Sequence, residues 1–353
     1  MQIIHCADVH FNRPFSGAES ELISRQRKQE QREVFARIIE AARGCDALCI
    51  AGDLFDGPYF DKPLLDWLNG QFSSIADTPV FIAPGNHDPY KPYSLYGLYQ
   101  FSDNVHIFSG ATEFIDYGSF RVYGNAGLPV GEISLDSDKI NILCLHTDLR
   151  KDSAYNPMTV QELASYGFDY AALGHVHAFS GIQKAGETCY AYSGVPFPGG
   201  FDEQGEKGFV AGTLEKGSCK LDFVPVAGRQ YHAVDVSVEN AGGYEELEEE
   251  ILYHCKRAPQ DFYQVILEGS VQFDFYPALL YERLADRFYY LKIKDSLHPP
   301  VSYEEMADSY SLKGVFVDKM LKRMEQEPNR REHLMRAMEY GLRALENKKI
   351  DIS

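Results

Sequence analysis

The chain has 353 residues, of which 44% are apolar and 24% charged, a composition typical of a globular protein of two or three domains. Its net charge of −18 argues against tight binding to nucleic acid through charge alone, because phosphate backbones are normally met by basic surfaces. No apolar run approaches the roughly 20 residues that cross a bilayer. Asp8, the first residue of chemical interest, comes too early for a cleavable signal peptide to precede it. We therefore expect a cytoplasmic protein that does not enter a membrane.

The seven cysteines predict reduced, mostly buried thiols. Their number is odd, they form no C-x-x-C pair, and several lie in apolar, strand-like runs. These residues are Cys6, Cys45, Cys49, Cys144, Cys189, Cys219 and Cys255.

The first part of the chain alternates between strand and helix patterns, which indicates an α/β core. Buried strands are expected at residues 3–7, 47–51 and 79–83, with amphipathic helices at 25–43 and 63–72. Further strands are expected later in the chain. Several follow one another without helices between them, so this later part is expected to form a mixed or antiparallel sheet. They lie at 120–123, 140–145, 170–173, 188–192, 208–214 and 220–226.

A boundary is expected near residue 228, where the pattern changes. Strands at 231–238 and 262–268 flank an acidic helix at 244–256, which predicts a small α+β unit. Beyond Pro299 and Pro300 the pattern is helical over 303–347, and Pro328 divides it into two helices. We therefore expect domains at 1–228, 229–300 and 301–353.

Short polar clusters follow the apolar strands and carry most of the chemical information. Carboxylates, imidazoles and one amide oxygen gather there, and the carboxyl ends of strands are where open α/β sheets place their sites. Such a set can bind two neighbouring divalent metals, Mn²⁺ among them, and paired metals cleave phosphate esters. The clusters are Asp8 and His10, Asp53 and Asp56, Asn86 and His87, His146, and His175 with His177.

Each cluster alone has an ordinary explanation. The first could be solvent-exposed surface, Gly85-Asn86-His87-Asp88 could be a turn, and His146 could be a core histidine. Their occurrence together, in this order and each after a strand, favours the metal-binding interpretation.

This ordered set resembles the calcineurin-like metallophosphoesterase superfamily, and within it the SbcD-like DNA-repair exonuclease branch. The resemblance lies in Ile3 to His10, in Leu173 to His177 and in Ser193 to Phe209, and it covers about residues 1–228. It implies a sandwich of two mixed sheets flanked by helices, followed by a small α+β capping domain and C-terminal helices.

The resemblance also implies a role for each clustered residue. One metal would be held by Asp8, His10, Asp53 and His177, and the other by Asp53, Asn86, His146 and His175, with Asp53 bridging. His87 would protonate the leaving oxygen, and Asp56 would orient His87. An alternative for Asp56 is a solvated loop acid.

The branch implies Mn²⁺-dependent exonuclease and endonuclease cleavage of DNA, in a complex with an SbcC-like coiled-coil ATPase. The terminal helices would dock that ATPase, although they could instead pack on their own domain, and the phosphoesterase domain would form a homodimer.

Two alternative functions stay open. The first is a phosphodiesterase or phosphatase for nucleotides or other small esters, which the acidic composition favours. The second is a non-enzymatic scaffold that holds an ATPase at DNA ends, which is disfavoured because every expected metal-ligand position is filled by a suitable residue.

Overall fold

The structure is a computed structural model that describes residues 1–18, 20–57, 61–128, 130–131, 133–150, 152–153, 155–226, 228–255, 260–298 and 302–345. The chain folds into two compact units. The first comprises Met1–Val234, Arg257–Gln264 and Ala285–Lys292, and the second comprises Asp235–Lys256, Val265–Leu284 and Ile293–Ser353. The domain boundaries expected near 228 and 300 stay predictions.

The first unit contains a six-stranded sheet in the order β12-β11-β1-β2-β3-β4. Its parallel strands are β1 (Gln2–Cys6), β2 (Ala47–Ala51), β3 (Val80–Ala83) and β4 (Val105–Ile107). The strands β11 (Gly208–Glu215) and β12 (Ser218–Pro225) continue the sheet in antiparallel fashion. Helices α1 (Glu21–Ala42) and α2 (Lys62–Ser73) connect the parallel strands, and the short α3 (Leu95–Leu98) precedes β4.

A second six-stranded sheet has the order β5-β6-β7-β8-β10-β9. Its centre, β6 (Phe120–Gly124), β7 (Ile140–His146), β8 (Tyr170–Gly174) and β10 (Thr188–Tyr192), is parallel. Only the edge strands β5 (Glu113–Asp116) and β9 (Gln183–Ala185) are antiparallel. The sheet is mixed, as expected, but more parallel than the sequence pattern suggested, since α4 (Val160–Tyr166) supplies a crossover that the pattern did not reveal.

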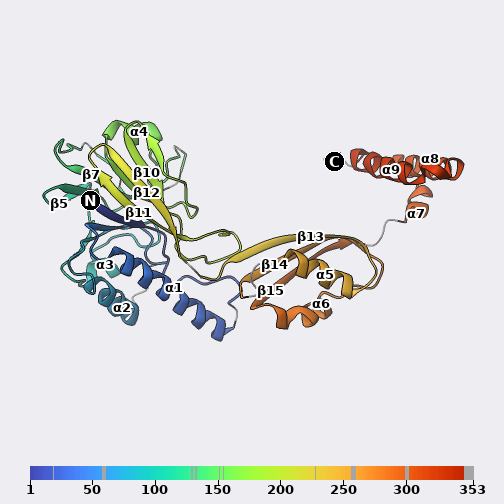
Figure 1. Ribbon diagram of the computed structural model, residues 1–353, viewed down its shortest axis with the longest axis horizontal. Coiled ribbons are helices and arrows are strands. Elements are labelled where there is room, and N and C mark those ends of the chain that lie inside the picture. Colours follow the sequence, from blue (N-terminus) through green and yellow to red (C-terminus); the bar gives the residue numbers. More distant parts are fainter. Residues whose placement is uncertain are drawn as a thin grey trace. The chain divides into compact units, whose positions relative to one another are not determined.

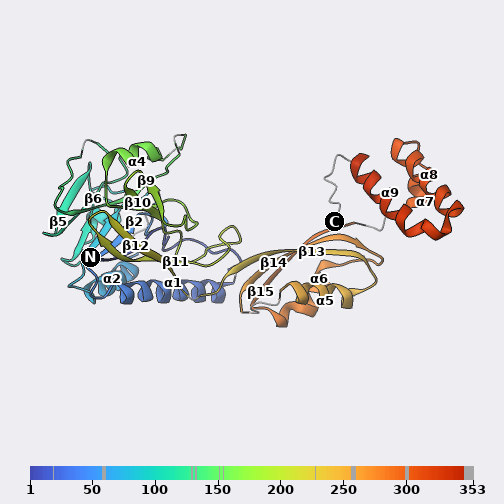
Figure 2. The ribbon, with the colours of Figure 1, turned by 45° about the horizontal axis from the view of Figure 1, so that its top comes forward.

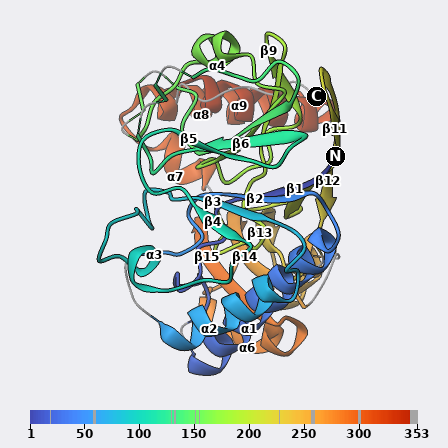
Figure 3. The same cartoon turned by 90° about the vertical axis from the view of Figure 1, so that its left-hand side faces the viewer.

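The two sheets pack face to face with helices outside them (Figure 3). Residues of both sheets, such as Cys49 and Cys144, share one buried apolar cluster between the layers. Phe35 of α1 and Leu68 of α2 pack against the outer face of the first sheet, and Leu163 of α4 packs against the second. The predicted sandwich of two mixed sheets flanked by helices is therefore confirmed. All seven cysteines are free, and five of them are buried.

A third sheet has the order β13-β14-β15, with strands Tyr231–Ala241, Phe262–Val271 and Tyr290–His298. Helices α5 (Tyr244–His254) and α6 (Pro277–Leu284) lie on one side of it (Figure 2). A 3₁₀ turn, Ala285–Arg287, follows α6. The sequence pattern predicted β13, α5 and β14 but missed α6 and β15.

The last described segment is helical, with α7 (Tyr303–Ala307), α8 (Leu312–Gln326) and α9 (Arg331–Leu345). Helices α8 and α9 lie side by side (Figure 1) and share a buried cluster that includes Val317, Met324, Leu334 and Met338. A 3₁₀ turn at Pro328–Arg330 separates them, at the proline where a break was predicted. Across the described residues, every helix is too short or too polar to cross a bilayer.

Candidate metal centre

All of the predicted site residues follow parallel strands of the two sheets and lie at the carboxyl ends of those strands. Asp8 and His10 come after β1, Asp53 and Asp56 after β2, and Asn86 and His87 after β3. From the second sheet, His146 ends β7, and His175 and His177 come directly after β8. The face-to-face packing of the sheets therefore brings both groups of loops to one place.

The backbone at this place is strained. Asp8, His10, Asp53 and His175 have positive φ angles of 53°, 51°, 50° and 106°. Such conformations cost of the order of 1–3 kcal/mol for residues other than glycine and persist only where the surroundings impose them. Here the Asp8 amide donates to the Gly52 carbonyl at 3.0 Å, and the His10 amide donates to the Asp53 carbonyl at 2.9 Å.

Two glycines allow the clustered side chains to approach the backbone closely. A Cβ atom on Gly52, which has a φ of 89°, would lie 2.4 Å from Nδ1 of His146. A Cβ atom on Gly85 would lie 2.1 Å from Oδ1 of Asp53. Any larger residue would therefore displace a side chain of the site.

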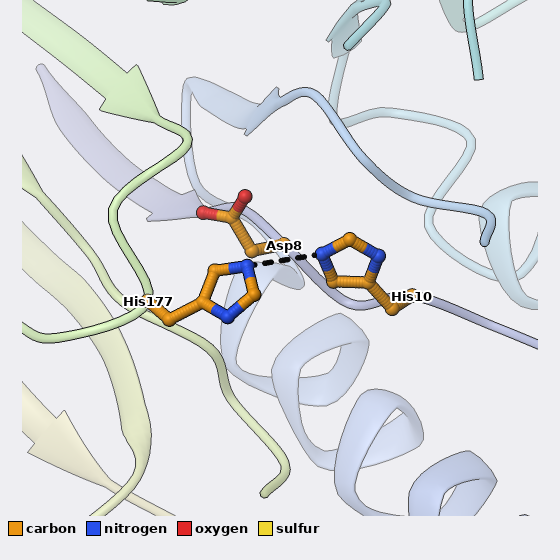
Figure 4. Close-up of side chains that lie close together, drawn as sticks. All are labelled: Asp8, His10 and His177. Atoms are coloured by element: carbon orange, nitrogen blue, oxygen red, sulfur yellow. Dashed lines mark hydrogen bonds between the residues drawn. The ribbon is translucent and has the colours of Figure 1, made fainter. Parts of the chain in front are cut away.

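His10 and His177 point their rings at each other beside Asp8 (Figure 4), and their Nε2 atoms are 3.2 Å apart. Nδ1 of His10 lies 3.1 Å from Asp56, and Nδ1 of His177 lies 2.7 Å from Glu203. Because an ionised carboxylate only accepts hydrogen bonds, both Nδ1 atoms carry the proton. In neutral rings the two Nε2 lone pairs then face each other, an arrangement that a shared cation would stabilise.

A second group of donor atoms converges around Asn86. Its Oδ1 lies 3.0 Å from Nε2 of His146 and 3.2 Å from Nδ1 of His175. Nδ1 of His146 donates to the Ala51 carbonyl at 2.9 Å, which leaves Nε2 free to bind a metal. Donors that share one ion at about 2.1 Å are separated by about 3 Å, so these spacings suit a common metal.

Asp53 lies between the two groups. Its Oδ2 is 3.7 Å from Nε2 of His10 and 3.4 Å from Nε2 of His146, while its Oδ1 accepts the His87 amide at 2.9 Å. Candidate donor atoms of Asp8, His10 and His177 lie within 4.8 Å of one another, as do those of Asp8, Asp53 and His146. The structure thus brings the predicted ligands together around two buried carboxylates, Asp8 and Asp53.

The electrostatics of the cluster also suit a cation. Burial raises the pKa of Asp8 to about 6. Burial lowers the pKa of His146, but the hydrogen bond to Asp53 and the charges of Asp8 and Asp53 outweigh it and raise that pKa to about 9. Buried carboxylates thus attract positive charge into the site, and a divalent ion supplies such charge without a proton. The donor set fits divalent metal binding.

His87 lies at the rim of the cluster, with 46% of its side chain exposed. Its Nδ1 is 3.0 Å from Oδ1 of Asp56, and the same oxygen is 3.1 Å from Nδ1 of His10. The predicted pairing of Asp56 with His87 is present. The contact of Asp56 with His10 was not predicted.

Sequence reasoning missed several carboxylates that hold the site residues. Asp88 is buried and accepts hydrogen bonds from the Gly85 amide, the Phe55 amide and the Tyr96 hydroxyl, so it ties two site loops together. Asp148 lies 3.8 Å from Nε2 of His175, and Glu203 contacts His177. Asp88 carried a signal, because it directly follows Gly85-Asn86-His87, and Glu203 lies in the Ser193–Phe209 stretch that carries the resemblance. The contacts of Asp148 with His175 and of Glu203 with His177 were not predicted, because each pair is far apart in sequence.

The two-sheet sandwich with carboxylates and imidazoles at its strand ends is typical of metal-dependent phosphoesterases. Residues 1–179 match the family model described as calcineurin-like phosphoesterase. Because this match covers half of the chain, the chain belongs to the calcineurin-like phosphoesterase family, and the predicted resemblance is confirmed. Members of this family bind divalent metal ions, and the structure holds a cluster of side chains suited to them.

Curated relatives add a more distant likeness. A Bacillus subtilis protein named uncharacterized metallophosphoesterase YhaO is 27% identical over 250 residues, covering 63% of this chain and 60% of the relative. The DNA double-strand break repair protein Mre11 of Aeropyrum pernix is 26% identical over 277 residues, covering 68% and 64%. Mre11 of Methanopyrus kandleri is 25% identical over 279 residues, covering 68% and 60%. The chain thus spans less than two thirds of the length of each of these relatives.

Proposed function

We propose that this protein is a Mn²⁺-dependent phosphodiesterase that cleaves DNA at a two-metal centre. In this proposal Asp8, His10, Asp53 and His177 hold one metal, and Asp53, Asn86, His146 and His175 hold the other. The observation that carries the proposal is the convergence of both donor groups on Asp53, which lies 3.7 Å from His10 and 3.4 Å from His146. Mixed nitrogen and oxygen donors without thiolates favour Mn²⁺ over a soft-metal site.

When bound, the metals activate water and stabilise charge on the phosphoryl group. The residues of the chain supply orientation and a proton. Asp56 accepts the Nδ1 hydrogen bond of His87, so Nε2 of this exposed ring can protonate the leaving oxygen. Asp88 fixes the loop that carries Asn86 and His87 through its bond to the Gly85 amide at 2.7 Å.

DNA is proposed as the substrate on the likeness to the Mre11 proteins, whose names place them in DNA double-strand break repair. By the SbcD-like resemblance we further propose an SbcC-like ATPase partner for α8 and α9, and a homodimer through the phosphoesterase domain. The exposed Leu312 and Val315 of α8 support a docking role for these helices, because 72% and 51% of their surfaces are accessible. We propose that the protein acts in the cytoplasm.

A second candidate is a phosphodiesterase or phosphatase for nucleotides or other small esters. The net charge of −18 favours it, because a small substrate needs no extended basic surface. The metal centre serves both substrate classes equally well.

A substrate panel separates the two candidates. Purified full-length chain with Mn²⁺ is incubated with duplex DNA, single-stranded DNA and bis-p-nitrophenyl phosphate, with EDTA as the blank. Loss of nucleotides from DNA supports the nuclease. Turnover of the small diester with both DNA substrates intact would select the second candidate, and inactivity on all three would contradict the phosphodiesterase proposal itself.

A further inference from the structure

We infer that Glu203 is the positioning residue for His177, and that the 199–203 turn is therefore part of the metal centre. This inference rests on the proposed function and extends it to a residue outside the predicted ligand set. Glu203 lies between β10 and β11, 26 residues beyond His177 in sequence.

Both carboxylate oxygens of Glu203 accept hydrogen bonds. Its Oε1 accepts hydrogen bonds from Nδ1 of His177 at 2.7 Å and from Nη1 of Arg13 at 3.0 Å. Its Oε2 accepts the Gly199 amide at 2.7 Å and a second hydrogen bond from Arg13. Only 5% of the Glu203 side chain is exposed, and this buried carboxylate forms an ion pair with Arg13.

The hydrogen bond to Glu203 fixes the ring of His177 more than the corresponding hydrogen bond to Asp56 fixes the ring of His10. The His10 side chain is 2% exposed, so the surrounding packing alone holds its ring. The His177 side chain is 39% exposed, and Glu203 is the hydrogen-bond partner of its Nδ1. A carboxylate that binds the distal nitrogen of a metal-ligating histidine fixes the tautomer and the ring orientation. Loss of Glu203 should therefore free the His177 ring to rotate.

The turn that carries Glu203 is itself fixed against the loop after His10. The Ser16 amide donates to the Gly199 carbonyl at 2.8 Å. A Cβ atom on Gly199 would lie 1.7 Å from Nη2 of Arg13, so the guanidinium packs directly on the glycine backbone. Arg13 and Gly199 thus hold Glu203 in place, and through it they aim His177 at His10.

The inference is tested by metal binding, without any substrate. Mn²⁺ is titrated into the metal-free full chain, and free Mn²⁺ is followed by its electron paramagnetic resonance signal. The wild type is compared with Glu203→Ala, with Glu203→Gln, which can still accept the hydrogen bond from Nδ1 of His177, and with Glu206→Ala, an exposed control on the same loop. We expect Glu203→Ala to bind one of its two Mn²⁺ ions about 10–100-fold more weakly. We expect Glu203→Gln to bind with intermediate affinity and Glu206→Ala to match the wild type.

A change of less than threefold in Glu203→Ala, or an equal loss in Glu206→Ala, would overturn the inference. If Glu203→Ala does not fold, as judged by its thermal melt, Glu203→Gln decides alone by the same threefold limit. If the wild type itself binds fewer than two Mn²⁺ ions, the proposed two-metal function fails, and the inference falls with it. Equal binding of two ions by the wild type and the Glu203 variants would overturn the inference alone.

Discussion

At the residue scale, a single oxygen of Asp56 joins two imidazoles with different proposed tasks. It lies 3.1 Å from Nδ1 of His10, a proposed ligand, and 3.0 Å from Nδ1 of His87, the proposed acid. The proton donor is thereby tied to the metal centre through one carboxylate. This arrangement keeps the exposed His87 ring beside His10 and the other proposed ligands.

Replacing His87 by Asn should remove the proton donor and leave the metal centre intact. We expect a fall in the rate of diester cleavage of about 10²–10⁴-fold, the usual contribution of a general acid, with metal content unchanged. Initial rates and elemental analysis measure both quantities, and His333→Asn, an exposed change in α9, serves as the control. Retained activity in His87→Asn would remove His87 from its proposed role.

His5 should make the fold sensitive to acid. Burial lowers the pKa of His5 to about 3, since its ring is enclosed between Tyr170 and the Leu173 carbonyl. The unfolded chain takes up this proton near pH 6.5, so stability that is present above this pH is lost as the pH falls from 6.5 toward 3.

Denaturant unfolding of the wild type and His5→Leu at pH 7 and pH 5 measures this effect. The wild type should lose up to about 2 kcal/mol more than the variant between these pH values, at about 1.4 kcal/mol per pH unit. The variant should already be less stable at pH 7, because Tyr170 loses its hydrogen-bond partner. An equal loss in both proteins would contradict the assignment.

Residue types and their positions after strands were enough to predict which side chains lie close together, because metal chemistry restricts the donors and parallel strands share one edge. Their roles as ligands stay predictions. The local backbone was not predictable. Nothing in an Asp-x-His pattern indicates that Asp8 and His10 adopt φ angles of 53° and 51°. Glu203 could not be assigned to His177 either, because only the tertiary fold brings the two together.

At the scale of elements, the loops that follow β2 and β3 each contain a glycine against which a side chain of the site packs closely. Gly85→Ala would place a methyl group 2.1 Å from Oδ1 of Asp53, so the carboxylate must move. We expect weaker Mn²⁺ binding and lower activity, while the sandwich stays folded. Gly70→Ala in α2, which has no atom within 4 Å of its added Cβ, is the matched control. Normal Mn²⁺ affinity in Gly85→Ala would show that Asp53 does not need this close approach.

The edge strands that sequence patterns missed share a physical reason. The short edge strands β5 and β9 and the exposed parts of β15 bury few side chains, so their apolar alternation is weak. The central strands β2, β3 and β8 are buried along their whole length and were predicted to within a residue or two. Burial along the whole length therefore made these central strands predictable.

At the scale of the whole molecule, the charge of −18 should make DNA binding depend on metal. We expect His87→Asn to show no binding to duplex DNA tighter than about 1 µM in EDTA, and measurable binding when Mn²⁺ is added. Fluorescence anisotropy with a labelled duplex reports both states. Tight binding in EDTA would mean that the chain recognises DNA through a surface other than the metal centre.

If two metals share Asp53, Asp53→Asn should hydrolyse bis-p-nitrophenyl phosphate in Mn²⁺ much more slowly than the wild type. Asp77→Asn, an exposed change of the same kind, is the control. We predict that Asp53→Asn loses at least about a hundredfold in rate while Asp77→Asn matches the wild type. A wild-type rate in Asp53→Asn would contradict the proposal that two metals share Asp53.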